Sequence, residues 1–203
     1  MLEVHVKTFG DTAFGIVYEG KAVFASNFGV NSEDVLRSFQ RMFPIEAPLH
    51  VAAEPSAFAQ KAVIVMRDIY EGKSTDETVL LALGRFPAYT QRVLKAVSRI
   101  PVGYVASYGG IADAVGGGAR AVGNVMATNC FAPLVPCHRV VSSSLGLGGY
   151  GGGLRVKYEF LRREKQRFTE PNQIPIEGGV LRVFPVEFVL RKLEKKHDAT
   201  TPI

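Results

Sequence analysis

The start of the chain alternates hydrophobic with polar residues, a pattern that predicts β-strands. Apolar positions recur at every second residue over 2–6, and apolar runs follow at 13–18 and 22–25. The polar stretch 19–21, with a central glycine, separates the last two runs and is typical of a hairpin turn. We therefore expect a half-buried strand followed by a β-hairpin.

The next segments carry helical periodicity. Hydrophobic residues recur at helical spacing over 35–43, after an N-cap signal at Asn31, and again over 56–70. Residues 78–83 then look like a strand. Together these elements predict a small α+β domain that ends near Gly84.

The character of the chain changes at residues 86–87. A helix with a buried stripe is predicted over 89–100, and Ser107 is placed to cap a short helix over 108–115. Three glycines, 116–118, then turn the chain into a further helix at 119–128. Two short helices joined by a glycine turn predict a helix-turn-helix.

After Glu164 the pattern changes again. Residues 173–177 look like a loop, 180–184 like a strand, and 186–196 like an amphipathic helix. The polar side of that helix ends in basic residues: Lys192, Lys195 and Lys196.

Composition places the chain among ordinary globular proteins. It has 47% hydrophobic and 21% charged residues, and no apolar run reaches the roughly 18 residues that a membrane span needs. The N-terminus has no signal-peptide pattern, so we expect a cytoplasmic protein with no membrane partner. The net charge of +5 is compatible with a polyanionic partner but does not by itself indicate one.

Cysteine and histidine usage limits the possible chemistry. Two cysteines make no disulfide framework, and no CxxC or HxxxH spacing indicates zinc. We therefore predict neither a metal site nor a cofactor. Cys130 is expected to be a small buried filler, and His5 and His50 are expected to be ordinary surface or structural residues.

The informative segment is Pro136-Cys137-His138-Arg139-Val140. A cysteine reacts as its thiolate, so it needs a base or a positive charge nearby, and histidine changes protonation near neutral pH. Taken alone, the pair is better explained as a buried cysteine beside an unrelated histidine.

The surrounding residues reverse that judgement. The segment 136–140 resembles the active-site signature of the O6-alkylguanine-DNA alkyltransferases, and further motifs of that family follow in the same order. They are 103–108 at the start of the first DNA-binding helix, 119–123 in the recognition helix, Asn129 as a hinge, 150–154, Lys157 and Glu164. The resemblance is tight over about 101–164 and loose before it.

The resemblance implies a role for each catalytic candidate. Cys137 is the nucleophile, and His138 takes its proton through a water. Glu164 holds the other nitrogen of His138 and favours the imidazolium. Tyr108 donates a proton to the leaving guanine, and Asn129 holds together the turns around the site.

The resemblance also implies how DNA is held. A base inside a duplex is out of reach of a buried thiolate, so the nucleotide is flipped out and Arg120 fills the vacated stack. The small residues of the recognition helix let it approach the minor groove closely. The implied DNA and substrate contacts are Arg120, Ala119, Ala121, Gly123, Ser107, Val140, Tyr150 and Gly151.

The expected function is irreversible transfer of the alkyl group from O6-alkylguanine, and also from O4-alkylthymine, in double-stranded DNA to Cys137 of a monomer. The fold class expected is α+β. The resemblance implies a ribonuclease-H-like domain over 1–84 and a mostly helical winged helix-turn-helix alkyltransferase domain over 85–170. Residues 171–203 form an extension of unknown role.

The sequence departs from the family at three points. The glycine turn 116–118 is shorter than the family's usual spacing between the two helices, and Gly151 stands where serine is common. The family usually ends soon after the position of Glu164, whereas this chain continues to Ile203.

Three other classes of protein remain open. A DNA-binding regulator would use the helix-turn-helix without the Cys-His-Glu residues. An alkylation sensor would bind the lesion without the nucleophile. A cysteine hydrolase would form an acyl-enzyme and turn over many times.

Overall fold

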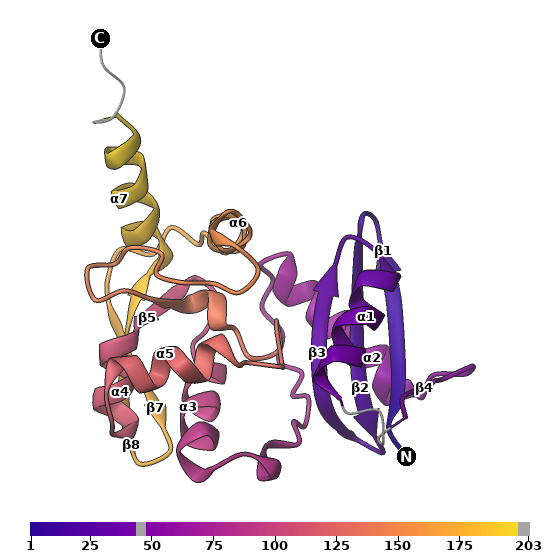
Figure 1. Ribbon diagram of the computed structural model, residues 1–203. Coiled ribbons are helices and arrows are strands. Elements are labelled where there is room, and N and C mark those ends of the chain that lie inside the picture. Colours follow the sequence, from indigo (N-terminus) through magenta and orange to yellow (C-terminus); the bar gives the residue numbers. More distant parts are fainter. Residues whose placement is uncertain (44–47, 199–203) are drawn as a thin grey trace. The chain divides into compact units, whose positions relative to one another are not determined.

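The computed structural model describes residues 1–43 and 48–198, and side chains up to residue 194. The contacts divide the chain into two compact units (Figure 1). The first comprises Met1–Tyr70, Thr75–Phe86 and Asn129–Val135, and the second comprises Glu71–Ser74, Pro87–Thr128 and Pro136–Ile203. The chain therefore leaves the first unit and returns to it twice before Cys137, at Thr75–Phe86 and at Asn129–Val135.

The first unit is built on a mixed four-stranded sheet in the order β3-β2-β1-β4. Strands β1 (Glu3–Phe9), β2 (Thr12–Glu19) and β3 (Ala22–Gly29) are antiparallel, and β4 (His50–Val51) pairs parallel to β1. The predicted strands and hairpin are confirmed, and Gly20 takes the left-handed φ of 58° that its tight turn requires.

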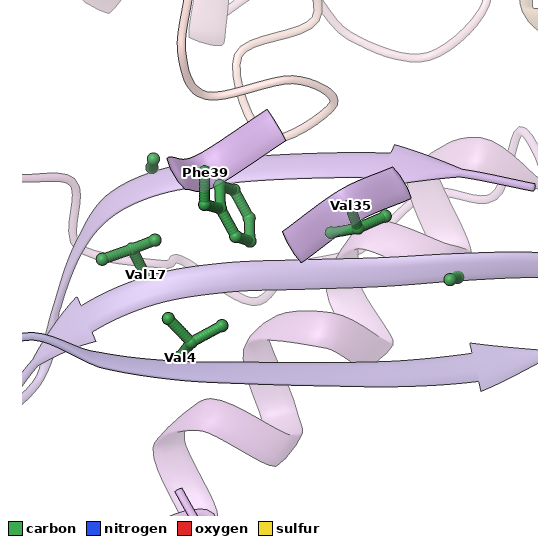
Figure 2. Close-up of a cluster of buried hydrophobic side chains, with 6 residues drawn as sticks. Val4, Val17, Val35 and Phe39 are labelled. Atoms are coloured by element: carbon green, nitrogen blue, oxygen red, sulfur yellow. The ribbon is translucent and has the colours of Figure 1, made fainter. Parts of the chain in front are cut away.

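Helices α1 (Ser32–Met42) and α2 (Ala57–Tyr70) both pack against β1 and β2, with Val17 facing α1 and Phe14 facing α2. Asn31 caps α1 by accepting a hydrogen bond from the Asp34 amide, as predicted. Figure 2 shows Val35 and Phe39 of α1 packed against Val4 and Val17. The helix approaches closely because β2 has a glycine at residue 15, where an added Cβ would lie 2.6 Å from Val35 Cγ1.

The predicted strand over 78–83 is wrong. Leu81 makes only an isolated bridge to Val23, and a short 3₁₀ helix, η1 (Leu83–Arg85), follows. The bridge supplies two backbone hydrogen bonds to Val23, from its amide to Leu80 and from Ala82 to its carbonyl.

The second unit combines helices with a four-stranded sheet in the order β6-β5-β8-β7. Helix α3 (Ala88–Ser98) is followed by β5 (Tyr104–Ser107). Most of the 103–108 motif is therefore a strand, and the first helix of the helix-turn-helix starts only at Tyr108. Helices α4 (Tyr108–Val115) and α5 (Ala119–Ala127) complete the predicted motif. Ser107 caps α4 by accepting a hydrogen bond from the Gly110 amide at 2.9 Å.

The extension after Glu164 is part of this unit. The predicted loop over 173–177 is wrong for residues 173–176, which belong to β7 (Asn172–Ile176), and residue 177 starts the turn to β8 (Gly179–Pro185). The two strands form a hairpin. Strand β8 pairs with β5 and packs on α4, so the hairpin lies beside the first helix of the helix-turn-helix.

The predicted C-terminal amphipathic helix is α7 (Val186–Asp198). Its apolar side contributes Val186, Val189 and Leu190 to a buried cluster with Val105 and Leu161. The side chains of Lys195 and Lys196 lie outside the described residues. In the described part of the chain, no helix is long and apolar enough to cross a membrane.

Candidate active site

The reactive segment follows the buried Pro136 and is a single 3₁₀ turn, η2 (Cys137–Arg139). It leads into β6 (Val140–Val141), which pairs parallel with the end of β5 and so holds the turn against the strand that precedes α4. Cys137 is partly exposed and is not in a disulfide, whereas His138 and Arg139 are buried. The thiol is therefore the accessible group of the turn.

His138 is fixed in position by two neighbours. Its Nε2 lies 2.8 Å from Oε1 of Glu164, the C-cap residue of α6 (Leu154–Arg163). Its ring stacks on Phe160 of the same helix, with 4.2 Å between ring centroids and 18° between ring planes. One helix therefore supplies both the hydrogen-bond partner and the apolar surface that orient the imidazole.

Arg139 neutralises the carboxylate that holds His138. Its Nε lies 3.1 and 3.0 Å from the two oxygens of Glu164, its second terminal nitrogen lies 2.8 Å from Oε1, and its first donates to the Ile100 carbonyl at 2.6 Å. Burial alone raises the pKa of Glu164, but the charges and hydrogen bonds of Arg139 and His138 lower it to about 2. Glu164 is therefore ionised at any physiological pH.

The protonation of His138 follows from this arrangement. Burial lowers the pKa of His138 below its usual value, and the attraction of Glu164 offsets only part of that effect. Glu164 therefore favours the imidazolium, as expected, but burial has the larger effect and favours the neutral form of His138. An ionised carboxylate only accepts hydrogen bonds, so a neutral His138 carries its proton on Nε2 and presents the lone pair of Nδ1.

That second nitrogen is placed as a proton acceptor. His138 Nδ1 is buried, and no group in the described part of the chain hydrogen-bonds to it. A buried polar atom without a partner is uncommon and marks a position where chemistry or a bound molecule completes the network.

Lys157 is a fully buried lysine on α6 that ties the site together. Its Nζ donates to the carbonyls of Val140 at 2.5 Å and Gly149 at 3.0 Å. Burial lowers the pKa of Lys157 to about 8, although the charge of Cys137 opposes the shift. The lysine thus joins β6 to the glycine-rich segment 142–153, which we call the site loop.

Tyr108 contacts the same part of the site loop. Its hydroxyl donates to the Gly149 carbonyl at 3.3 Å. Burial raises the pKa of Tyr108, and the charge of Cys137 raises it further, so the phenol stays protonated at neutral pH. Gly148 has a left-handed φ of 68°, and a Cβ there would lie 2.9 Å from the tyrosine ring. The close approach of loop and ring requires a glycine.

The recognition helix presents a surface of small residues. Val122 and Val125 of α5 are buried, while Ala119 and Arg120 are exposed and Ala121 and Gly123 are partly exposed. Nothing lies within 4 Å of a Cβ built on Gly123, so that face is open. Gly116 and Gly117 carry φ angles of 86° and 96° in the turn before it, which explains how so short a connection is made.

Asn129 and Cys130 belong to the first unit. The Asn129 amide donates to the Val135 carbonyl at 3.1 Å, and its oxygen accepts from the Phe131 amide at 3.0 Å. Asn129 thus closes the turn that ends just before Pro136. Burial raises the pKa of the Cys130 thiol, although Arg85 opposes the shift. A raised pKa keeps the Cys130 thiol protonated, which suits its predicted filler role, although Cys130 is partly exposed rather than fully buried.

Comparison with known proteins decides the family. Residues 88–166 match the family described as the 6-O-methylguanine DNA methyltransferase DNA-binding domain. Methylated-DNA–protein-cysteine methyltransferases of Mycobacterium bovis and Mycobacterium tuberculosis are 44% identical to this chain over 120 residues, which is 58% of this chain and 72% of theirs. The chain belongs to the O6-methylguanine DNA methyltransferase family. The predicted family and enzyme class, methylated-DNA–protein-cysteine methyltransferase, are confirmed.

Solved structures agree with this assignment. The crystal structure of Mycobacterium tuberculosis O6-methylguanine methyltransferase is 32% identical in sequence to this chain, with a TM-score of 0.63. The match covers 83% of this chain and 96% of that one. The structure of the Mycobacterium tuberculosis protein in complex with DNA is 30% identical, with a TM-score of 0.63, covering 81% of this chain and 94% of that one. The predicted α+β fold with two domains is therefore the fold of the O6-methylguanine DNA methyltransferases.

The geometry of this methyltransferase groups most of the predicted catalytic residues in one unit. Cys137, His138, Glu164 and Tyr108 lie in the second unit with Val140 and Tyr150, whereas Asn129 is placed by contacts within the first. Ser107 acts structurally here, as the cap of α4. Gly151 is exposed, with nothing within 4 Å of a Cβ built on it.

Two residues of this site were missed as functional candidates. The sequence motif includes Arg139 but assigns it no function, although its charge helps to keep Glu164 ionised. Lys157 was noted only as a matching position, although it is among the largest buried side chains. A lysine in the amphipathic pattern of α6 gives no sign of burial, because its solvent-facing neighbours are also basic.

Proposed function

We propose that this protein repairs O6-alkylguanine in double-stranded DNA by moving the alkyl group onto Cys137 Sγ, once per molecule. The observation that carries the proposal is the state of His138. Its Nε2 is held by an ionised Glu164, and its Nδ1 is a buried acceptor without a partner, one residue from a partly exposed thiol. This arrangement suits removal of the thiol proton through a water.

The proposed reaction conserves atoms and charge. Sγ forms a bond to the alkyl carbon while the bond from that carbon to guanine O6 breaks. The thiol proton goes to His138, and the departing guanine receives a proton on its ring from Tyr108. Tyr108 is then reprotonated at the expense of His138, so the products are a thioether and normal guanine. A thioether has no route back to a thiol here, and each molecule acts once.

Glu164 and Arg139 act on the reaction through His138. The imidazolium formed during proton transfer lies against the Glu164 carboxylate, which stabilises it, while Arg139 keeps that carboxylate ionised and in place. Neither group touches the substrate in this proposal. Both are positioning residues.

The substrate contacts follow from backbone groups. The carbonyls of Cys137 and Val140 would accept from the exocyclic amine of guanine, and the Gly151 amide would face the lesion oxygen, with Tyr150 beside it. Each carbonyl already accepts one bond, from the Val140 amide and from Lys157 respectively. A carbonyl oxygen has two lone pairs, so one remains available on each.

DNA binding is assigned to the helix-turn-helix of the second unit. Arg120 is exposed on α5, among small residues, and would occupy the space left by the flipped nucleotide. Ala119, Ala121, Gly123 and Ser107 would lie close to the DNA backbone. We propose residues 85–170 as the DNA-binding and transfer domain, residues 1–84 as a ribonuclease-H-like supporting domain, and residues 171–203 as an extension.

We extend the proposal to O4-alkylthymine, because its alkyl group is also attached to an exocyclic oxygen. We further propose that the protein works as a monomer without cofactor or metal, since the second unit of one chain carries the groups of the proposed proton and alkyl transfers. The cytoplasm is the proposed location.

The test is the intact mass of the protein after incubation with duplex DNA carrying O6-methylguanine. We expect one methyl group per chain, mapped to Cys137, in the wild type and in Cys130→Ala. Cys137→Ala should gain nothing while still binding the duplex. Lesion binding without any mass gain in the wild type would indicate a sensor, and release of many product molecules per chain would indicate a hydrolase.

A further inference from the structure

The site loop, residues 142–153, is held at two separate places. Near the reactive cysteine, the Gly149 carbonyl accepts hydrogen bonds from Tyr108 and Lys157. Nearer its start, the Ser142 amide donates to the Gly146 carbonyl and the Leu145 amide donates to the Ser142 carbonyl, which closes a tight turn. The loop is rich in glycine, so its order depends on such contacts.

Helix α7 supplies the second point of attachment. Lys192 donates from Nζ to the Ser144 carbonyl at the tip of the tight turn. Leu145 and Leu147 pack against a buried cluster that contains Val186, Val189 and Leu190 of α7, and Leu193 packs against the same cluster. We call Lys192, Leu190 and Leu193 the α7 clamp.

The conformation of the turn shows why it needs support. Leu145 has a φ of 57°, in the left-handed region that residues other than glycine seldom adopt. Such a residue persists only where its surroundings hold it. The Leu145 side chain packs against the apolar cluster, and the carbonyl of the preceding residue, Ser144, accepts a hydrogen bond from Lys192.

We propose that the α7 clamp positions the site loop for alkyl transfer. The clamp comes from residues beyond the 88–166 region that matches the family, so it is a device of this chain's extension. The inference rests on the proposed function for its effect on transfer, but its effect on the loop is independent of that function.

The clamp acts on the reaction through the position of Gly149 and the residues that follow. When the start of the loop is free, the stretch 149–153 keeps the hydrogen bonds to Gly149 and the contact of Tyr150 with Phe160, but it samples more conformations. A large alkyl group such as benzyl must contact an ordered loop to be oriented for attack by the thiolate, whereas the orientation of a methyl group depends less on such contacts. Loosening the clamp should therefore slow transfer of benzyl more than transfer of methyl.

The experiment compares Lys192→Met with a rescue variant, Lys192→Arg, and a matched control, Arg191→Met. Arg191 is the exposed neighbouring cation on α7, and no bond from it to the site loop is present among the described residues. The first readout is amide hydrogen exchange across residues 142–153. The second is the single-turnover rate on duplexes carrying O6-methylguanine or O6-benzylguanine. The rate at saturating DNA and the DNA concentration that gives half of that rate are determined separately.

We expect Lys192→Met to lose exchange protection at residues 142–149, with the rest of the second unit unchanged. The saturating rate should fall about tenfold for benzyl, the effect of losing roughly one hydrogen bond, and less for methyl. Lys192→Arg should restore both, and Arg191→Met should behave as wild type.

Three results would overturn the proposal. They are unchanged protection of the site loop in Lys192→Met, loss of protection spread evenly over the second unit, and a loosened loop with unchanged rates on both duplexes. Leu193→Ala serves as the second variant and should reproduce the local loss of protection. If the wild type transfers no alkyl group at all, the proposed function fails, while the exchange measurement still decides whether α7 orders the loop.

Discussion

His138 Nε2 and Glu164 Oε1 lie 2.8 Å apart with both side chains fully buried. The pair is separated by 26 residues in sequence and is brought together because η2 packs on α6. Arg139 completes it from the residue next to His138. Removing one charge from a buried ion pair destabilises the folded protein, because the remaining charge is then buried without a partner.

Glu164→Gln should destabilise the protein by about 3–5 kcal/mol, because Arg139 then keeps a buried positive charge without its counter-ion. Urea unfolding of the two proteins at neutral pH measures the difference. Glu159→Gln is the matched control, since Glu159 pairs with Arg162 on the surface at 2.8 Å and such pairs contribute about 1 kcal/mol or less. Equal losses in the two variants would contradict the role of the buried pair.

The same carboxylate predicts how stability changes in acid. The pKa of Glu164 is lowered from 4.5 to about 2, so between these values the unfolded chain binds more protons than the folded one. Its contribution is fully present above pH 4.5 and is lost as the pH falls toward 2. Denaturation over this range should show a steeper loss in the wild type than in Glu164→Gln. Parallel curves would show that Glu164 is not responsible.

Lys157 predicts a change of stability in alkali. Its pKa is lowered from 10.5 to about 8, so between these values the folded protein has released a proton that the unfolded chain still holds. Stability attributable to Lys157 should therefore rise with pH over this window, by about 3 kcal/mol at most. The measurement is the unfolding free energy of the wild type minus that of Lys157→Met. A difference that falls with pH would contradict the buried position of the ammonium group.

Gly148→Ala should slow alkyl transfer about tenfold or more, because its Cβ would lie 2.9 Å from the Tyr108 ring and its φ of 68° is unfavourable for alanine. Gly149→Ala is the matched control: nothing lies within 4 Å of a Cβ there, and its φ is not in the left-handed region. Single-turnover kinetics on the same duplex compares them. If both variants keep the wild-type rate, the contact between loop and ring does not position Tyr108.

Arg120→Ala should reduce transfer from duplex DNA by about tenfold or more while leaving the reaction with free O6-benzylguanine unchanged, because only a duplex base must be flipped out. Arg99→Ala is a control for loss of charge, since Arg99 is also exposed but lies at the end of α3. Equal losses with DNA and with the free base would argue against the flipping role.

Local signals predicted the helices and the hairpin around residues 19–21 well. Asn31 and Ser107 marked the starts of α1 and α4, and the glycine turn between α4 and α5 was read from three consecutive residues. Each of these features is decided within a few residues of the chain, where capping and turn chemistry operate.

Features that depend on a distant partner were predicted poorly. Residues 173–176 include a proline and a polar side chain, and they form a strand only because β8 pairs with them. Residues 78–83 have the composition of a strand but find only one bridging partner, at Val23. Likewise, the motif around Cys137 was recognisable, but the neutral state of His138 follows from burial, which sequence does not show.

The β7–β8 hairpin also determines how the domain meets other protein chains. By pairing with β5, it leaves β7 as the outer strand of the sheet on that side, and β7 carries Pro175. A proline withholds a backbone donor and discourages further strands from adding to an edge. A chain cut before residue 172 would instead present the uncovered edge of β5, with the apolar Val105 beside it. Such a fragment should aggregate during expression, even though it would retain every residue of the transfer reaction.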